Sequence, residues 1–315
     1  MALYRAFGLT LDSPAVFPGL HPVPADETPD VVVSLVGRAG LDAAWAGTGS
    51  TVLWETRFPD GRDVRVVRAA DGSQQIEYGT DALFQLSPDT GTVQCAPAVA
   101  EDAHWMRFFL DTVLWWLCLS RGRHGLHASA VESDGCVLAF AGVTGGGKTT
   151  LAAELLGRGW SLFTDDVVIL ERGPGDRAVS HPGPGLMNLP WAIGNPDRLG
   201  RRIARFDEQR EDWIAVDRSS TAARELTALV LLRRAPGLAT SLEQRDGSAI
   251  DVLPHLWGLP GDLQSHFHAA GDLVAETPIF ALDADVDTEP AVMADLVERT
   301  APAIAHRILE GSLTG

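Results

Sequence analysis

Cysteine is scarce in this sequence. Cys95, Cys118 and Cys136 are the only cysteines among 315 residues, and they are widely spaced. Neither a zinc site nor a disulfide framework has such spacing. The chain also begins without an apolar core of signal-peptide length and without a small-residue cleavage pattern. We therefore expect a protein of the reducing cytoplasm.

Basic residues and long apolar runs are scarce as well. The chain has 25 basic against 42 acidic side chains, so it lacks the broad positive charge that attracts nucleic acid or anionic lipid. Its most apolar segment, residues 105–119, contains Arg107 and Asp111. This segment is shorter than the roughly 20 residues of a membrane span. We expect no nucleic-acid partner, no membrane and a buried helix.

The remaining composition is typical of globular proteins. Apolar residues make up 45% of the chain and charged residues 21%. The length favours two domains over one, and no internal repeat or low-complexity tract is present. Assembly into a homo-oligomer stays open.

The first hundred residues are rich in strand signals. Residues 31–35 and 51–54 are short runs of Val, Thr, Leu, Ser and Trp. Asp60-Gly61 and Asp71-Gly72 separate later runs, and Asp-Gly between apolar runs is a strong hairpin signal. We expect a β-rich N-terminal domain over residues 1–100.

The pattern changes after residue 100. No Gly or Pro occurs from Glu101 to Arg121, which predicts a linking helix over residues 101–122. Residues 123–315 then predict an α/β domain. A buried strand at 137–141, a helix at 148–158 and a strand at 161–164 indicate a parallel α/β unit. Further strands are predicted at residues 226–232 and 278–282, and a further helix at residues 289–309.

Two segments have the composition of loops or surface. Residues 173–185 are rich in Gly and Pro, and residues 198–218 alternate charges with few apolar side chains. We expect a mobile segment over a bound nucleotide there.

The segment Gly142–Thr149 fits the phosphate-binding pattern G-x-x-x-x-G-K-[ST], with an apolar strand before it and a helix after it. Its glycines allow backbone N–H groups to point at phosphates, and the helix N-terminus adds a positive field. Lys148 would reach the β- and γ-phosphates and the Thr149 hydroxyl would bind Mg²⁺. We predict an ATP and Mg²⁺ site. Its residues are Gly142, Thr144, Gly145, Gly146, Gly147, Lys148, Thr149 and Thr150.

Two carboxylates, Asp165 and Asp166, follow the second predicted strand of this unit. Ligands of open α/β sheets bind at the carboxyl ends of the strands. One carboxylate can hold the metal ion, and its neighbour can accept a proton. Upstream, a predicted hairpin places His127 beside the strand that leads into the loop, which makes a contact with the transferred phosphoryl group plausible.

These residues resemble the HPr kinase/phosphorylase family, and more closely the stand-alone kinases of that type encoded with ribosomally made peptides such as lasso peptides. The matching segments are Leu126-His-Ala-Ser129, the Gly142–Thr149 loop, the helix at residues 151–159 and Asp165-Asp166 with the following Val-Val. The opening Tyr4-Arg-Ala-Phe-Gly-Leu9 is also similar.

The resemblance implies a role for each matched residue. Asp166 takes the place of the catalytic carboxylate that removes the proton of the acceptor hydroxyl. His127 matches the active-site His, Lys148 the loop Lys and Thr149 the hydroxyl that binds magnesium. We assign Asp165 to the metal side of the pair.

The chain departs from the family in one signature. Glu-Ile-Arg-Gly-Leu-Gly is missing, and the nearest stretch is residues 181–189. The resemblance therefore does not extend to the second metal-binding carboxylate, to HPr as substrate or to the reverse phosphorylase reaction. Candidates for the family's later catalytic Arg are Arg201, Arg202, Arg205 and Arg218.

We expect an α/β phosphate-loop kinase domain preceded by a β-rich domain. The predicted reaction is γ-phosphoryl transfer from ATP to a hydroxyl, either a peptide Ser or a small hydroxylated molecule. Two alternatives stay open. One is a regulatory or interaction protein that binds ATP without transfer, and the other is an ATPase.

Overall fold

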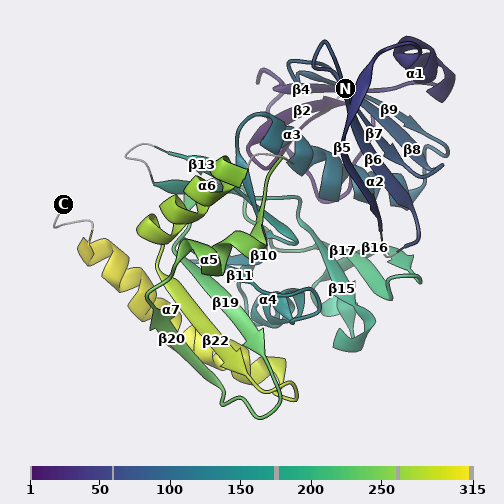
Figure 1. The fold of residues 1–315 in the computed structure, drawn as a ribbon. Coiled ribbons are helices and arrows are strands. Elements are labelled where there is room, and N and C mark those ends of the chain that lie inside the picture. The colour runs from purple at the N-terminus through teal and green to yellow at the C-terminus, as the bar shows by residue number, and fades with distance from the viewer. Residues whose placement is uncertain (1, 59, 174–176, 260–262, 312–315) are drawn as a thin grey trace.

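The computed structural model describes residues 2–58, 60–173, 177–259 and 263–311, with side chains placed up to residue 301. Two large sheets dominate these residues, and helices lie between and beside them (Figure 1). The α/β class predicted from the sequence is confirmed. The domain boundaries at residues 100 and 122 stay predictions.

A nine-stranded sheet forms the N-terminal part. Its hairpins turn at Asp60-Gly61 and Asp71-Gly72, as predicted. Side chains of a strand alternate between the two faces, so Ile76 and Tyr78 are buried while Glu77 between them is not. In sheet order the strands are β3 (His21–Pro22), β1 (Ala2–Ala6), β2 (Leu9–Ser13), β4 (Val31–Leu35), β9 (Thr92–Pro97), β8 (Ala82–Leu86), β7 (Gln74–Tyr78), β6 (Asp63–Ala69) and β5 (Ser50–Arg57). The helix α1 (Arg38–Trp45) packs on β8 and β9 through Leu41.

One helical run crosses the centre of the molecule. It consists of α2 (Ala103–Phe108), a π-helical turn (Phe109–Val113) and α3 (Leu114–Ser120). Its apolar side chains share a core with the nine-stranded sheet and with Val167 and Ile169 of the second sheet. The buried helix predicted for this segment is confirmed. Among the helices that the structure describes, none is long and apolar enough to cross a bilayer.

The second sheet carries the phosphate-loop motif. Strand β10 (His124–Ser133) forms a hairpin with β11 (Cys136–Ala141), and β12 (Ser161–Thr164) pairs with the other edge of β10. Strands β11 and β12 therefore run in the same direction, as predicted, but β10 lies between them. The remaining strands are β13 (Val167–Arg172), β14 (Ala178–His181), β18 (Arg224–Glu225), β19 (Ala228–Arg234), β20 (Ser241–Arg245), β21 (Leu256–Trp257) and β22 (Ile279–Ala284).

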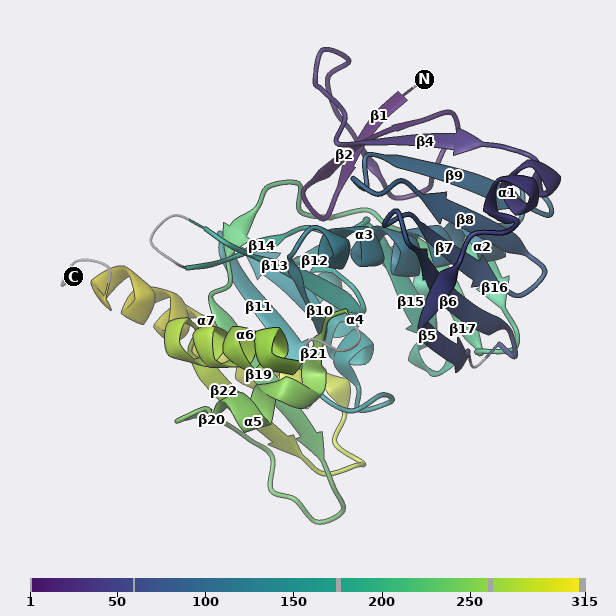
Figure 2. The ribbon, with the colours of Figure 1, turned by 45° about the horizontal axis from the view of Figure 1, so that its top comes forward.

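Helices flank both faces of this sheet (Figure 2). Leu138 and Phe140 of β11 face the core under α4 (Lys148–Gly157) and α7 (Pro290–Gly311). Val137 and Ala139 point to the opposite core, under α5 (Ala249–Val252) and α6 (Leu263–Glu276). A strand buried on both faces is apolar at every position, which explains the uninterrupted run before the loop. Strands β19 and β22 and helix α7 confirm the elements predicted downstream.

Loop or surface was predicted for residues 198–218, and the loop part of that prediction is wrong. These residues form β16 (Gly200–Phe206) and β17 (Glu211–Val216), which pair with each other, and β17 also pairs with β15 (Leu186–Pro190). The charges occupy exposed positions of β16, whereas Phe206 and Trp213 enter the core. Of residues 173–185, residues 178–181 form β14, and residues 174–176 lie outside the described ranges.

Candidate functional site

The phosphate-loop motif lies between β11 and α4, with a geometry that requires glycine. Gly147 has φ +100°, a conformation that side-chain-bearing residues rarely adopt. A Cβ on Gly142 would lie 2.7 Å from the Leu232 carbonyl oxygen, so β19 excludes a side chain there. Helix α4 begins at Lys148, directly after the loop. Its free N-terminal N–H groups and its dipole favour an anion at this position.

Lys148 is a buried cation whose partners are neutral. Only 6% of the residue is exposed, and its Nζ lies 3.1 Å from the Gly142 oxygen and 3.4 Å from the Val143 oxygen. Its third contact is His127 Nε2 at 3.2 Å. Among the described residues no carboxylate forms an ion pair with Lys148. Burial lowers the pKa of Lys148. The charges of Asp166 and Asp165 oppose this shift, but neither carboxylate bonds to the ammonium group, so the site fits a phosphate group.

Asp165 is held at the start of α4 by two hydroxyl groups. Thr149 Oγ1 donates to Asp165 Oδ1 at 3.1 Å, and Ser129 Oγ donates to the same oxygen at 2.6 Å. The other carboxylate oxygen accepts the Asn188 backbone N–H at 3.1 Å. Burial and the charge of Asp166 raise the pKa of Asp165 to about 7. The structure therefore brings together the two residues predicted to hold the metal ion.

Asp166 lies in the bend between β12 and β13 with φ +64°, a left-handed conformation that Asp tolerates better than most residues. Its Oδ2 accepts a hydrogen bond from Asn188 Nδ2 at 2.8 Å. The Asn188 amide also donates to Asp111 Oδ2 at 3.1 Å. The sequence analysis missed Asp111 and Asn188. The interruption of an apolar helix by Asp111 is the signal that was available.

His127 connects Lys148 to Asp166. Its Nδ1 lies 3.1 Å from the backbone oxygen of Asp166, and because a carbonyl cannot donate, Nδ1 carries the proton. Nε2 then accepts from the Lys148 ammonium group. Burial and the Lys148 charge lower the pKa of His127. The ring stacks on Trp257, with centroids 4.7 Å apart. A neutral imidazole with one fixed tautomer results.

The four arginines suggested by the sequence lie elsewhere. Arg202 and Arg205 pair with Asp212, and Arg218 donates to the Gly159 oxygen. None of the four lines the cavity described below. Two other arginines near the site were missed. A Cβ on Gly147 would lie 3.5 Å from Arg234 Nη1, and Arg107 lines the same cavity as Asp166.

A cavity of about 930 Å³ opens on the loop and on Asp166. Its floor includes Gly142, Thr144 and His127, and its far wall is made of α2, α3 and β5. Cavities of this size enclose small-molecule ligands. The first residues of the loop and Asp166 therefore share one space with side chains of the N-terminal sheet.

The donor set fits a hard cation such as Mg²⁺ bound together with phosphates. Among the described residues, no group of three or more His, Cys, Asp or Glu side chains forms a metal site. Magnesium usually takes only one or two protein carboxylates, and phosphate oxygens and water fill the remaining positions. The Asp165 carboxylate and the Thr149 hydroxyl, 3.1 Å apart, are suited to that role.

Comparisons with known proteins add little to the geometry of the site. No protein-family model matches the chain, and no curated protein matches it. Among solved structures, the Hpr(Ser) kinase/phosphatase from Coxiella burnetii is similar, with a TM-score of 0.35 and 14% identity. The likeness covers 60% of this chain and 98% of that chain. A likeness this weak identifies neither the family nor the activity of this chain.

Proposed function

We propose that this protein is an ATP-dependent phosphotransferase that moves the γ-phosphoryl group of ATP to a hydroxyl, on a peptide Ser or on a small molecule. The observation that carries the proposal is the different placement of two adjacent carboxylates. Asp165 is tied to the Thr149 hydroxyl at the loop, whereas Asp166 lines the cavity and is oriented by Asn188.

In the proposed site the loop N–H groups and Lys148 bind the triphosphate, and Thr149 and Asp165 hold Mg²⁺. The metal ion would supply positive charge to the β- and γ-phosphate oxygens. Lys148 leaves the loop carbonyls to contact those oxygens, while His127 limits its position. These groups act by charge stabilisation and alignment, which dominate phosphoryl transfer.

Asp166 acts on the acceptor. The acceptor oxygen forms a bond to the γ-phosphorus while the bond from that phosphorus to the bridging oxygen of ADP breaks. The hydroxyl proton passes to the Asp166 carboxylate. Asn188 holds that carboxylate through a 2.8 Å hydrogen bond, so the base is positioned before the acceptor binds.

The two alternatives make different use of these residues. A protein that only binds ATP needs Lys148 and Thr149 but has no use for an oriented carboxylate at Asp166. An ATPase transfers to water, which does not need the large cavity in front of Asp166. Both observations favour transfer to an acceptor.

The test compares Asp166→Asn with Asp134→Asn, an exposed Asp that, like Asp166, has positive φ. Asp166→Asn should bind ATP with unchanged affinity in calorimetry, and transfer of labelled phosphate to Ser-containing peptides and small alcohols should fall about 10²–10⁴-fold. Asp134→Asn should behave like the wild type. Normal transfer by Asp166→Asn would leave only a nucleotide site.

A further inference from the structure

The wall of the cavity opposite the loop is aromatic. Six rings come from the N-terminal sheet and the central helix. They are Trp54, Phe58, Tyr78, Phe108, Trp115 and Trp116. Trp54 and Phe58 are only half buried, although most rings of this protein's core are fully buried. Large apolar side chains left half exposed inside a cavity indicate a surface that a ligand covers.

A row of ring contacts connects this aromatic wall to His127. Trp54 contacts Trp115 with centroids 6.4 Å apart, Trp115 contacts Trp257 at 5.2 Å, and Trp257 stacks on His127 at 4.7 Å. His127 in turn contacts Lys148. A ligand that binds with an apolar group on this row of rings therefore has its neighbouring atoms beside the phosphate loop.

Polar atoms without partners lie at another corner of the same cavity. His104 Nε2, Arg107 Nη1 and Gln209 Oε1 are buried and make no hydrogen bond within the described part of the chain. Two of these residues contact Phe206: the His104 ring lies 4.9 Å from it, and the Arg107 guanidinium lies over it at 4.6 Å. Buried polar groups normally have hydrogen-bond partners, so we expect a ligand in the cavity to form hydrogen bonds with these atoms.

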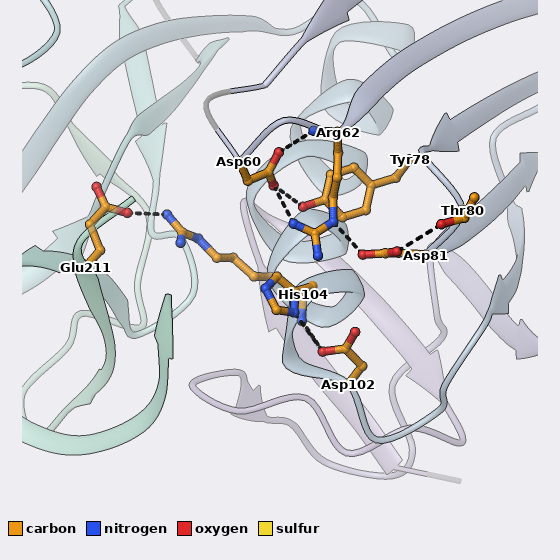
Figure 3. A network of polar contacts seen from close by, with 9 residues as sticks. Asp60, Arg62, Tyr78, Thr80, Asp81, Asp102, His104 and Glu211 are labelled. Atoms are coloured by element: carbon orange, nitrogen blue, oxygen red, sulfur yellow. Dashed lines mark hydrogen bonds and ion pairs between the residues drawn. The ribbon is translucent and has the colours of Figure 1, made fainter. Parts of the chain in front are cut away.

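Acidic side chains outnumber basic ones in the lining of the cavity. Asp60, Asp111, Asp166 and Glu211 line the cavity against the cations Arg57 and Arg107. Arg107 is already bound to Glu211 at 2.6 Å and to Asp111 at 3.4 Å. Figure 3 shows Asp60 between Arg62 and the Tyr78 hydroxyl, and Glu211 on the opposite side. A negatively charged acceptor would meet repulsion from this set.

We propose that the acceptor is an uncharged or cationic molecule that carries an aromatic group next to its hydroxyl, bound by the aromatic wall and the row of rings. The inference rests on the proposed function, because it concerns the acceptor of the same reaction. Offset and edge-on ring contacts give this wall a preference for flat groups over aliphatic groups of similar size. The source of the aromatic group is either a peptide segment or a free alcohol.

The test measures binding without transfer. The probes are Ac-Phe-Ser-NH₂, Ac-Ala-Ser-NH₂, Ac-Glu-Ser-NH₂ and 2-phenylethanol, titrated by calorimetry into protein saturated with Mg²⁺ and a non-hydrolysable ATP analogue. We expect the Phe peptide to bind about tenfold more tightly than the Ala peptide, and the Glu peptide to bind most weakly. Equal affinities for the Phe and Ala peptides, or tightest binding of the Glu peptide, would overturn the proposal.

Variants then locate the preference. Trp54→Leu and Phe58→Leu should each reduce the Phe-over-Ala ratio several-fold, and Trp54→Phe should keep it. Trp191→Leu, which removes a half-buried Trp outside the cavity, should leave the ratio unchanged. Glu211→Gln should strengthen binding of the Glu peptide. An unchanged ratio in both Leu variants would contradict the assignment of the wall.

The remaining outcomes distinguish a peptide from a free alcohol as the acceptor, and they distinguish the acceptor proposal from the proposed function. Binding of 2-phenylethanol as tight as that of the Phe peptide supports a small alcohol, and binding of the peptide alone supports a peptide whose amides reach Arg107 and Gln209. Selective binding without any phosphate transfer from ATP would support the acceptor site and reject the proposed function. Phosphate transfer without selective binding would support the proposed function and reject the acceptor site.

Discussion

The side-chain amide of Asn188 lies 2.8 Å from the Asp166 carboxylate, and the same nitrogen donates to Asp111. Its backbone N–H binds Asp165. One residue of β15 therefore holds both carboxylates of the bend after β12. This arrangement makes Asn188 a positioning residue for the proposed base.

Asn188→Ala should lower kcat by about 10²-fold with a small effect on the KM for ATP, because a misplaced base fails to reach the acceptor while the loop stays intact. Steady-state kinetics across a pH range measure this. A merely structural role would instead lower the melting temperature and leave the kcat of the folded fraction unchanged. Asn195→Ala, outside the cavity, is the matched control.

The sequence predicted the loop, the flanking strand and helix, and the two carboxylates, because these depend on local spacing. The helix at residues 103–120 was also predictable from its lack of Gly and Pro. The sequence could not predict that Asp111 and Asp166 share the Asn188 amide, since the three residues are far apart in the chain and meet only through the packing of the central helix.

The incorrect loop at residues 198–218 has a related cause. The charges were attributed to a loop or surface segment, yet in β16 they are exposed side chains of a strand that pairs with β17. The cavity could not be predicted from the sequence either. Its far wall uses Trp54 and Phe58, which follow no catalytic motif and reach the loop only through tertiary structure.

Lys148→Met should abolish transfer but stabilise the nucleotide-free protein. The hydrogen-bond partners of Lys148 are neutral, and its burial outweighs the attraction of Asp166 and Asp165. Replacing it with an apolar side chain of similar length should therefore stabilise the fold by about 1–3 kcal/mol. Urea unfolding without nucleotide measures the gain. Arg172→Met, at an exposed ion pair, should change stability by less than about 1 kcal/mol. A destabilised Lys148→Met would show that the ammonium group is well satisfied without phosphate.

Asp165→Asn should raise the magnesium concentration needed for half-maximal transfer more than it lowers the rate at saturating magnesium. The Thr149 and Ser129 hydroxyls can still bind the amide oxygen, so the local fold should persist. The assay is transfer at several magnesium concentrations, beside Asp166→Asn as the contrasting variant. Equal effects of the two substitutions at every magnesium concentration would contradict separate roles.

The last prediction concerns Asp111 and pH. Burial and the charge of Asp166 raise the pKa of Asp111 to about 6 from 3.8, while Arg107 opposes the shift. The folded state therefore binds this proton more tightly than the unfolded state does. Its stabilising contribution is complete below about pH 4 and is lost as the pH rises through about 6.

Asp111→Asn removes that titration while keeping the shape of the side chain. The variant and the wild type should have similar free energies of unfolding at pH 4, and at pH 7 the variant should be more stable by about 1–3 kcal/mol. The lower end of this range allows for the 25% exposure of the Asp111 side chain. Urea unfolding of metal-free protein between pH 4 and 7 measures the difference. Asp165 and Glu211 titrate in both proteins, so their effects largely cancel in the difference. A difference that stays constant over this range would mean that Asp111 is ionised throughout, which requires Arg107 to outweigh both the burial and the charge of Asp166.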